Sequence, residues 1–182
     1  MKARLPLLMI SAALSSHVMA AAPANPSLLN NGFFELPGVQ PGTSATFSSI
    51  PGWSTNCTIT LTHQAVGNLA AYQGAQYAEI APGANCNITQ TFATTPGGTY
   101  SACFAYSPKP GANSGTNPLW FSWEGIAIQA VVRDGTALTA PAWLNYCVTG
   151  LKATGSSSTI GFINVNGGVS SGLIDGVKVK PF

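Results

Sequence analysis

The sequence predicts an all-β fold, a β-sandwich or a barrel. Beyond Asn30, roughly nine short strand-like segments alternate with turns rich in Gly, Pro, Asn and Ser. Ser, Thr, Asn and Gly are abundant, which favours strands and turns over helices. No stretch has a convincing helical period.

Each predicted strand is identified by apolar alternation or by the turns beside it. In 100–107, for example, Tyr100, Ala102, Phe104 and Tyr106 share one face, and the segment follows a Pro-Gly-Gly turn at 96–98. In chain order, the predicted strands are 57–62, 77–80, 88–92, 100–107, 119–123 with 126–132 as one long or broken strand, 146–153, 159–165 and 174–179.

Three regions follow from the composition along the chain. Residues 1–20 have the features of a signal peptide: Lys2 and Arg4, an apolar stretch over 5–14, and a small-x-small cleavage pattern at 18–20. Residues 21–29 are a Pro- and Ala-containing linker, and 30–182 form one domain. No other segment is apolar enough to span a membrane, so we expect a secreted protein, extracellular or periplasmic.

The charges exclude several functions. Of the 12 charged residues, Lys2 and Arg4 lie in the leader, which leaves five basic and five acidic residues and a net charge of about zero. A protein without a basic stripe is not expected to bind nucleic acid. His63 is the only histidine after the leader, which disfavours most metal and acid–base catalytic schemes.

Four cysteines follow the leader, and an even number in an oxidising compartment predicts two disulfides. Three pairings are possible. Cys57 alternates with Ile59, and Cys86 with Ile88, so both cysteines point to an apolar face. We therefore favour Cys57–Cys86 and, by remainder, Cys103–Cys147.

An ordered set of short motifs resembles a known family. The motifs are Asn31-Gly32-Phe33-Phe34-Glu35, Ile50-Pro51-Gly52-Trp53, 74–80, 88–92, 96–100, 106–111, Asn117, Trp123-Glu124-Gly125, Trp143 and Ile174-Asp175-Gly176-Val177. Together they resemble the galactose-binding-like jelly rolls, and in particular the domain-of-unknown-function six-forty-two family of secreted and cell-wall proteins. The resemblance implies a jelly-roll β-sandwich of two antiparallel sheets, placed outside the cell and associated with polysaccharide.

Two positions depart from that family pattern. Lys109 stands where arginine is frequent, which removes a bidentate donor. Gly176 follows Asp175 where Asn or Asp is frequent, which removes a second oxygen ligand at this point.

Glu35 and Asp175 are carboxylates on strand faces that are otherwise apolar. An unpaired buried carboxylate is costly, so each needs a partner. The resemblance implies a structural Ca²⁺ between the first and last strands, and oxygen ligands suit that ion. The alternative is that both side chains cap turns by accepting main-chain N–H bonds.

The candidate ligand contacts lie around the long loop at 107–118. Sugars present flat C–H faces and many hydroxyls, so a binding site combines exposed aromatic rings with polar side chains. The candidates are Trp120, Trp123, Tyr106, Asn113, Asn117 and Glu124. For the aromatic residues the alternative is burial in the core, and for the asparagines it is turn formation.

These observations favour a non-catalytic carbohydrate-binding protein that recognises a cell-wall or matrix polysaccharide. The alternative is a structural or adhesive matrix protein that acts through protein–protein contacts. A small hydrolase is a third possibility, and a glycosidase would need two carboxylates such as Glu79 and Glu124. The spacing of these two residues does not support a hydrolase, and the sequence contains no nucleophile-elbow motif.

Overall fold

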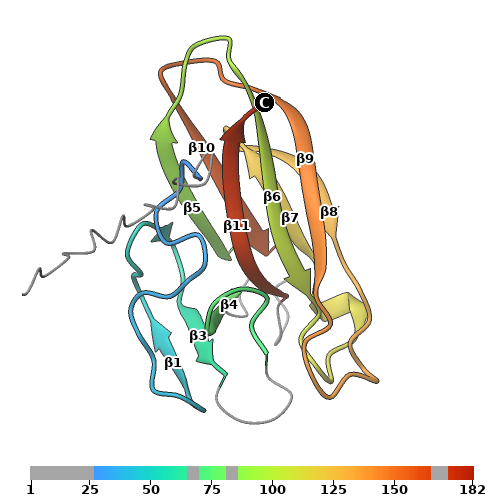
Figure 1. The fold of residues 1–182 in the computed structure, drawn as a ribbon. Coiled ribbons are helices and arrows are strands. Elements are labelled where there is room, and N and C mark those ends of the chain that lie inside the picture. The colour runs from blue at the N-terminus through green and yellow to red at the C-terminus, as the bar shows by residue number, and fades with distance from the viewer. Residues whose placement is uncertain (1–26, 65–69, 81–85, 165–171) are drawn as a thin grey trace, which may run out of the picture.

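The fold is a sandwich of two antiparallel sheets, as Figure 1 shows. The structure is a computed structural model that describes residues 27–64, 70–80, 86–164 and 172–182. It confirms the prediction of an all-β sandwich. The proposed leader and most of the proposed linker lie outside the described residues.

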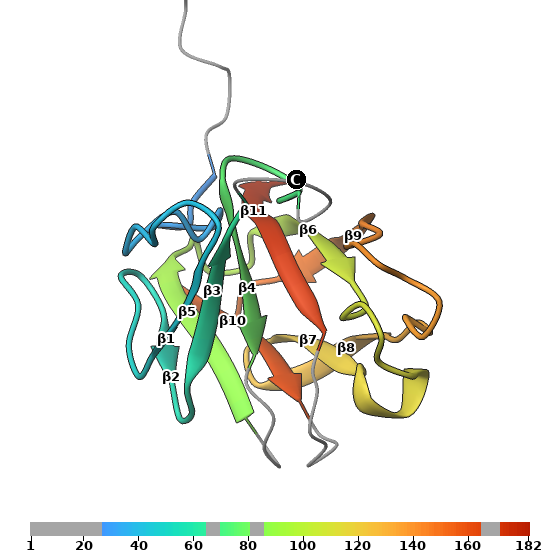
Figure 2. The ribbon, with the colours of Figure 1, turned by 90° about the horizontal axis from the view of Figure 1, so that it is seen from below.

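Each of the two sheets is built from strands that lie far apart in the sequence (Figure 2). The six-stranded sheet has the order β1 (Ser44–Phe47), β3 (Ile59–His63), β4 (Gln76–Ile80), β11 (Leu173–Pro181), β6 (Thr99–Ser107), β9 (Leu144–Lys152). The five-stranded sheet has the order β2 (Ser54–Thr55), β5 (Cys86–Ala93), β10 (Ser157–Asn164), β7 (Leu119–Trp123), β8 (Ile126–Val131). A single 3₁₀ turn, η1 (Ser114–Thr116), is the only helical element among the described residues.

The core lies between the sheets and is rich in aromatic rings. Phe104 on β6 stacks on Phe121 on β7 with ring centroids 5.4 Å apart, and meets Phe162 on β10 edge-on at 4.9 Å. All three rings are fully buried. Burial of a side chain of this size is worth about 1.5–3 kcal/mol, so these alternating inward positions hold the two layers together.

The segment predicted as one long or broken strand, 119–132, is a hairpin. Glu124 and Gly125 connect β7 to β8 with φ values of 50° and 80°. Positive φ at both central residues is the mark of the tight turn that suits strand twist. A glutamate at such a position is uncommon, and for that reason alternation alone did not reveal the turn.

The proposed linker ends earlier than the sequence indicates. Leu28 donates its main-chain N–H to the carbonyl of Val179 on β11 at 2.9 Å, and the side chain of Leu29 is buried. Residues 27–29 therefore belong to the domain. No helix among the described residues has the length and apolar character needed to cross a membrane.

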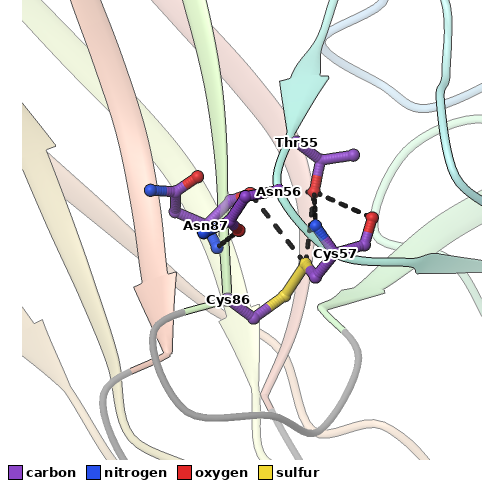
Figure 3. The surroundings of a disulfide bond; sticks show 5 residues. All are labelled: Thr55, Asn56, Cys57, Cys86 and Asn87. Atoms are coloured by element: carbon purple, nitrogen blue, oxygen red, sulfur yellow. Dashed lines mark hydrogen bonds between the residues drawn. A yellow bond between two sulfur atoms is a disulfide. The ribbon is translucent and has the colours of Figure 1, made fainter.

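Both predicted disulfides are confirmed. Cys57–Cys86 joins the segment after β2 to the start of β5, beside a hydrogen bond from the Thr55 hydroxyl to the Asn87 carbonyl (Figure 3). Cys103–Cys147 joins two directly paired residues on β6 and β9. The first bridge ties the segment after the edge strand β2 to its neighbour β5, and the second ties the edge strand β9 to its neighbour β6.

Candidate functional site

Glu35 and Asp175 lie under one loop, the segment that precedes β4. Glu35 accepts the main-chain N–H groups of Ala75 and Gln76 through Oε1, at 2.8 and 3.0 Å. Asp175 accepts the N–H of Gln73 through Oδ2 at 2.8 Å and that of Gly176 through Oδ1 at 2.6 Å. The geometry thus has the bonds expected of turn-capping carboxylates.

Asp175 is fully buried, and its environment opposes ionisation. Desolvation raises its pKa to about 7, against the lowering effect of the bonds from Gln73, Gly176 and Tyr72, and the nearby charge of Glu35 adds to the rise. The one ion pair among the described residues, between Lys109 and Glu79, involves neither carboxylate. The pair Glu35 and Asp175 therefore has hydrogen-bond partners but no described counter-charge.

The chemistry of these two residues fits a hard cation, because both supply carboxylate oxygens and the charge of Glu35 raises the pKa of Asp175, an effect that a divalent ion would offset. They are only two, and the described residues hold no cluster of three or more His, Cys, Asp or Glu side chains. Main-chain carbonyls would have to complete the coordination of a Ca²⁺ ion.

Three of the six candidate ligand contacts are buried parts of the fold. Tyr106 is fully buried, its hydroxyl bonds to the Asn117 carbonyl at 2.9 Å, and its pKa is raised to about 12, mainly by desolvation. Asn117 is fully buried and organises the long loop. Trp123 packs in the core between Phe92 and Tyr100. None of the three offers a surface to a ligand in this structure.

Two further candidates have local structural bonds. The Asn113 side chain accepts the N–H of Gly115 at 2.9 Å and so caps η1. Glu124 accepts hydrogen bonds from the Ser158 hydroxyl and from Thr154, and these bonds lower its pKa. Glu79 lies on the other sheet, on β4, and pairs with Lys109 at 2.7 Å. The structure therefore does not pair Glu79 with Glu124 for glycosidase chemistry.

The sixth candidate, Trp120, lies on the outer surface. It alternates on β7 with the buried Leu119 and Phe121, so its ring points away from the core, and it is partly exposed. Its cross-strand partners are Ile163 on β10 and Ala130 on β8. Trp120 is thus an aromatic ring in the middle of the outward side of the five-stranded sheet.

Polar and small residues surround that ring. We call the Trp120 face the outward patch formed, on β5, β10 and β7, by Asn87, Thr89, Ile163, Gly161, Trp120 and Ser122. Gly161 is buried, and a Cβ there would lie 2.8 Å from Ser122 Oγ and 3.1 Å from Thr89 Cγ2, so the space between these two side chains admits no more than a glycine. The Asn87 side chain points away from the disulfide, as Figure 3 shows.

Trp120 differs from the other three tryptophans in the hydrogen bonding of its indole N–H. Trp53, Trp123 and Trp143 each donate Nε1–H to a main-chain carbonyl, at 3.0, 2.7 and 2.8 Å respectively. Within the described part of the chain, Trp120 Nε1 has no hydrogen-bond partner. Trp120 thus combines a partly exposed ring with an indole N–H that makes no hydrogen bond to the described residues.

A second aromatic group lies on the six-stranded sheet and was not predicted as a site. Trp143 packs against Tyr72 at 6.3 Å and edge-on against Tyr77 at 5.6 Å. Tyr72 is 44% exposed. The sequence signal was weak, because Tyr72 and Trp143 lie in segments without alternation, and the fold brings them together.

Comparison with known proteins identifies the fold. No protein family and no curated protein matches the sequence, so membership of the six-forty-two family is not confirmed. Among solved structures, the enzymatically active domain of bacteriophage CBA120 tailspike protein 4 aligns with a TM-score of 0.55 at 14% identity. That alignment covers 86% of this chain but only 21% of the tailspike chain.

Two carbohydrate-binding modules align over nearly their whole length. TmCBM61, solved in complex with β-1,4-galactotriose, has a TM-score of 0.51 at 15% identity, with coverage of 86% of this chain and 99% of that chain. The CBM22-1 xylan-binding domain of Paenibacillus barcinonensis Xyn10C has a TM-score of 0.50 at 16% identity, with coverage of 76% and 92%. The likeness confirms the jelly-roll β-sandwich.

Proposed function

We propose that this protein binds a polysaccharide through the Trp120 face, without catalysis. The observation that carries the proposal is the state of Trp120: a partly exposed ring on a sheet face, with an indole N–H that has no partner among the described residues. A sugar can stack its ring on the aromatic surface and at the same time accept a hydrogen bond from the indole N–H through a hydroxyl oxygen.

The neighbours of Trp120 suit the same ligand class. The partly exposed Thr89 and Asn87 provide donors and acceptors for sugar hydroxyls, and the face carries no charged side chain. A neutral or weakly charged glycan chain fits this surface better than an anionic polymer.

The fold comparison supports the same class. TmCBM61 was solved with β-1,4-galactotriose and the CBM22-1 domain is described as xylan-binding. At identities of 14–16% this carries no specific sugar over to the chain, but it favours a neutral plant-type polysaccharide as the first to test.

The test measures binding of the purified, disulfide-bonded protein to β-1,4-galactan, xylan, mannan and β-glucan by affinity electrophoresis and calorimetry. We expect saturable binding to at least one of them and its loss in Trp120→Ala. Tyr72→Ala is the matched control, because it removes an exposed aromatic ring from the other sheet. Binding that survives Trp120→Ala, or no binding to any polysaccharide by the folded protein, contradicts the proposal.

Export and calcium complete the proposal. The leader-like residues 1–20 and the two disulfides support placement outside the cytoplasm. Ca²⁺ held by Glu35 and Asp175 would be structural, neutralising the two carboxylates next to the loop before β4, of which Asp175 is buried. Elemental analysis of the purified protein, with thermal melting before and after EDTA treatment, tests it.

The second candidate function is a structural or adhesive role through protein–protein contacts. It is favoured by the exposed apolar residues of β8, a strand that contains no charged residue. Association that does not depend on sugar would support it.

A further inference from the structure

The sandwich has one side at which both sheets end in a long strand. β8 is the last strand of the five-stranded sheet, and β9 is the last strand of the six-stranded sheet. Figure 1 shows the two strands next to each other on the right of the molecule. At the opposite side the sheets end in β1 and β2, with four and two residues, against six in β8 and nine in β9. Short edge strands protect a sheet from pairing with another chain, and long ones do not.

The core is open along this side. Ile126 pairs with the buried Trp123, and directly opposed residues point to the same face, so Ile126 points inward although it is 66% exposed. Leu144 on β9 pairs with the buried Tyr106 and is 45% exposed. Within the described residues, inward-facing apolar side chains of both sheets therefore reach water.

Charge protects these two edges little, because Lys152 at the end of β9 is the one charged residue in the two strands. From Ile126 to Val132, and from Leu144 to Leu151, there is no charged residue. Ile128 and Val132 add further exposed apolar surface, at 44% and 48%. Each edge strand has a register irregularity, in β8 opposite Phe121 and Ser122 and in β9 opposite Tyr100 and Ala102, which leaves Leu144–Val148 as the longest regular stretch.

We propose that this side is the interface of a two-fold homodimer, in which β8 pairs with β8 and β9 with β9 of a second copy. A two-fold axis perpendicular to the sheets makes both pairings antiparallel at once, because both edges lie on the same side of the sandwich. A single extended peptide would cover one edge only. A second copy covers both, continues both sheets and encloses Ile126 and Leu144 in a shared core.

The same two-fold pairing avoids repulsion between like charges of the two copies. β8 holds no charged residue and β9 only Lys152 at its last position, and the antiparallel arrangement brings the Glu124 end of one β8 next to the Arg133 end of the other. This inference is independent of sugar binding, since it uses the edges of the sheets and not the Trp120 face.

The test is sedimentation velocity of the purified protein over a wide concentration range, with Ile126→Lys, Leu144→Lys and the double variant. Each lysine appears twice in a two-fold interface, so we expect each single variant to weaken dimerisation by at least about tenfold and the double variant to be monomeric. Leu36→Lys is the matched control, because Leu36 is 55% exposed in the N-terminal segment, and it should dimerise like the unmodified protein.

Hydrogen–deuterium exchange of the unmodified protein gives a second readout that needs no substitution. The main-chain amides at the outer edges of β8 and β9 should become protected as the concentration rises, with no change in β1. A protein that stays monomeric at all concentrations overturns the proposal. So does a double variant that dimerises as well as the unmodified chain, or protection that does not change in β8 and β9.

Discussion

The hydroxyl of Tyr106 donates a hydrogen bond to the main-chain carbonyl of Asn117 at 2.9 Å. Asn117 in turn accepts the N–H of Lys109 and donates to the carbonyls of Ala112 and Asn113. A buried tyrosine of the core thus holds Asn117, which in turn fixes the long loop between β6 and β7. Residues around this loop act as its framework, and the surface suited to a ligand lies on the sheet beside it.

We predict that Tyr106→Phe lowers stability without changing polysaccharide binding. The substitution leaves the buried carbonyl of Asn117 without its donor, which costs about 1–3 kcal/mol. Chemical denaturation measures the loss, and affinity electrophoresis measures binding. Tyr72→Phe, at an exposed tyrosine, is the control and should leave stability unchanged. A loss of sugar affinity in Tyr106→Phe with unchanged stability would return Tyr106 to the list of ligand contacts.

We also predict that stability falls as the pH rises from about 4 to about 7 in the presence of a chelator. Asp175 keeps its proton in the folded protein up to about pH 7, whereas in the unfolded chain it loses it near 3.9. The folded state therefore binds more protons in this window, and the free energy of unfolding decreases with rising pH. Thermal melting across the window measures this fall.

Two additions make the pH experiment specific. Asp175→Asn should flatten the profile, and Asp134→Asn should not, because Asp134 is exposed and bonds to Thr136 lower its pKa. Saturating Ca²⁺ should also flatten it, since a bound cation favours the ionised carboxylate. A profile that keeps its slope in Asp175→Asn assigns the effect to another group, and one that ignores Ca²⁺ contradicts the calcium site.

The sequence predicted the strands better than it predicted the site, for a physical reason. Alternation in β6 places Tyr100, Phe104 and Tyr106 on one buried face, and a pattern with period two needs only local residues. The same pattern places Trp120 and Trp123 on opposite faces of β7, but it does not say which face is inside. That depends on β10, which lies about 40 residues further along the chain.

Loop positions were harder still. Asp134-Gly135 is a dipeptide typical of hairpin turns, but Gly135 is part of the connection from β8 to β9, where its carbonyl accepts the N–H of Gly111 and its N–H donates to the carbonyl of Ala112. A Cβ at Gly135 would lie 2.4 Å from the Lys109 carbonyl oxygen. The glycine is therefore needed because two loops pass close to each other here, and not because the chain forms a hairpin. Contacts between distant loops leave no periodic signal in the sequence.

A methyl group at Gly161 should weaken polysaccharide binding. The Cβ of Gly161→Ala displaces the Ser122 hydroxyl and crowds Thr89 on the Trp120 face, at a stability cost on the order of 1 kcal/mol. Gly155→Ala is the matched control: its Cβ would meet nothing closer than 3.8 Å, so affinity and melting temperature should be unchanged. Calorimetric titration of both variants with the polysaccharide measures their affinities. Equal affinities would place the ligand away from Gly161.

The last prediction joins the two proposals. A two-fold axis perpendicular to the sheets keeps the Trp120 faces of both copies on the same side, with three strand spacings, about 14 Å, between the two β7 strands. A long polysaccharide can then contact both Trp120 rings, whereas a trisaccharide reaches one. Ile126→Lys with Leu144→Lys should therefore lower the affinity for the polymer by about tenfold or more and leave the affinity for the trisaccharide unchanged. Equal losses for both ligands would show that the lysines disturb the binding face itself, and no loss for either would separate dimerisation from recognition.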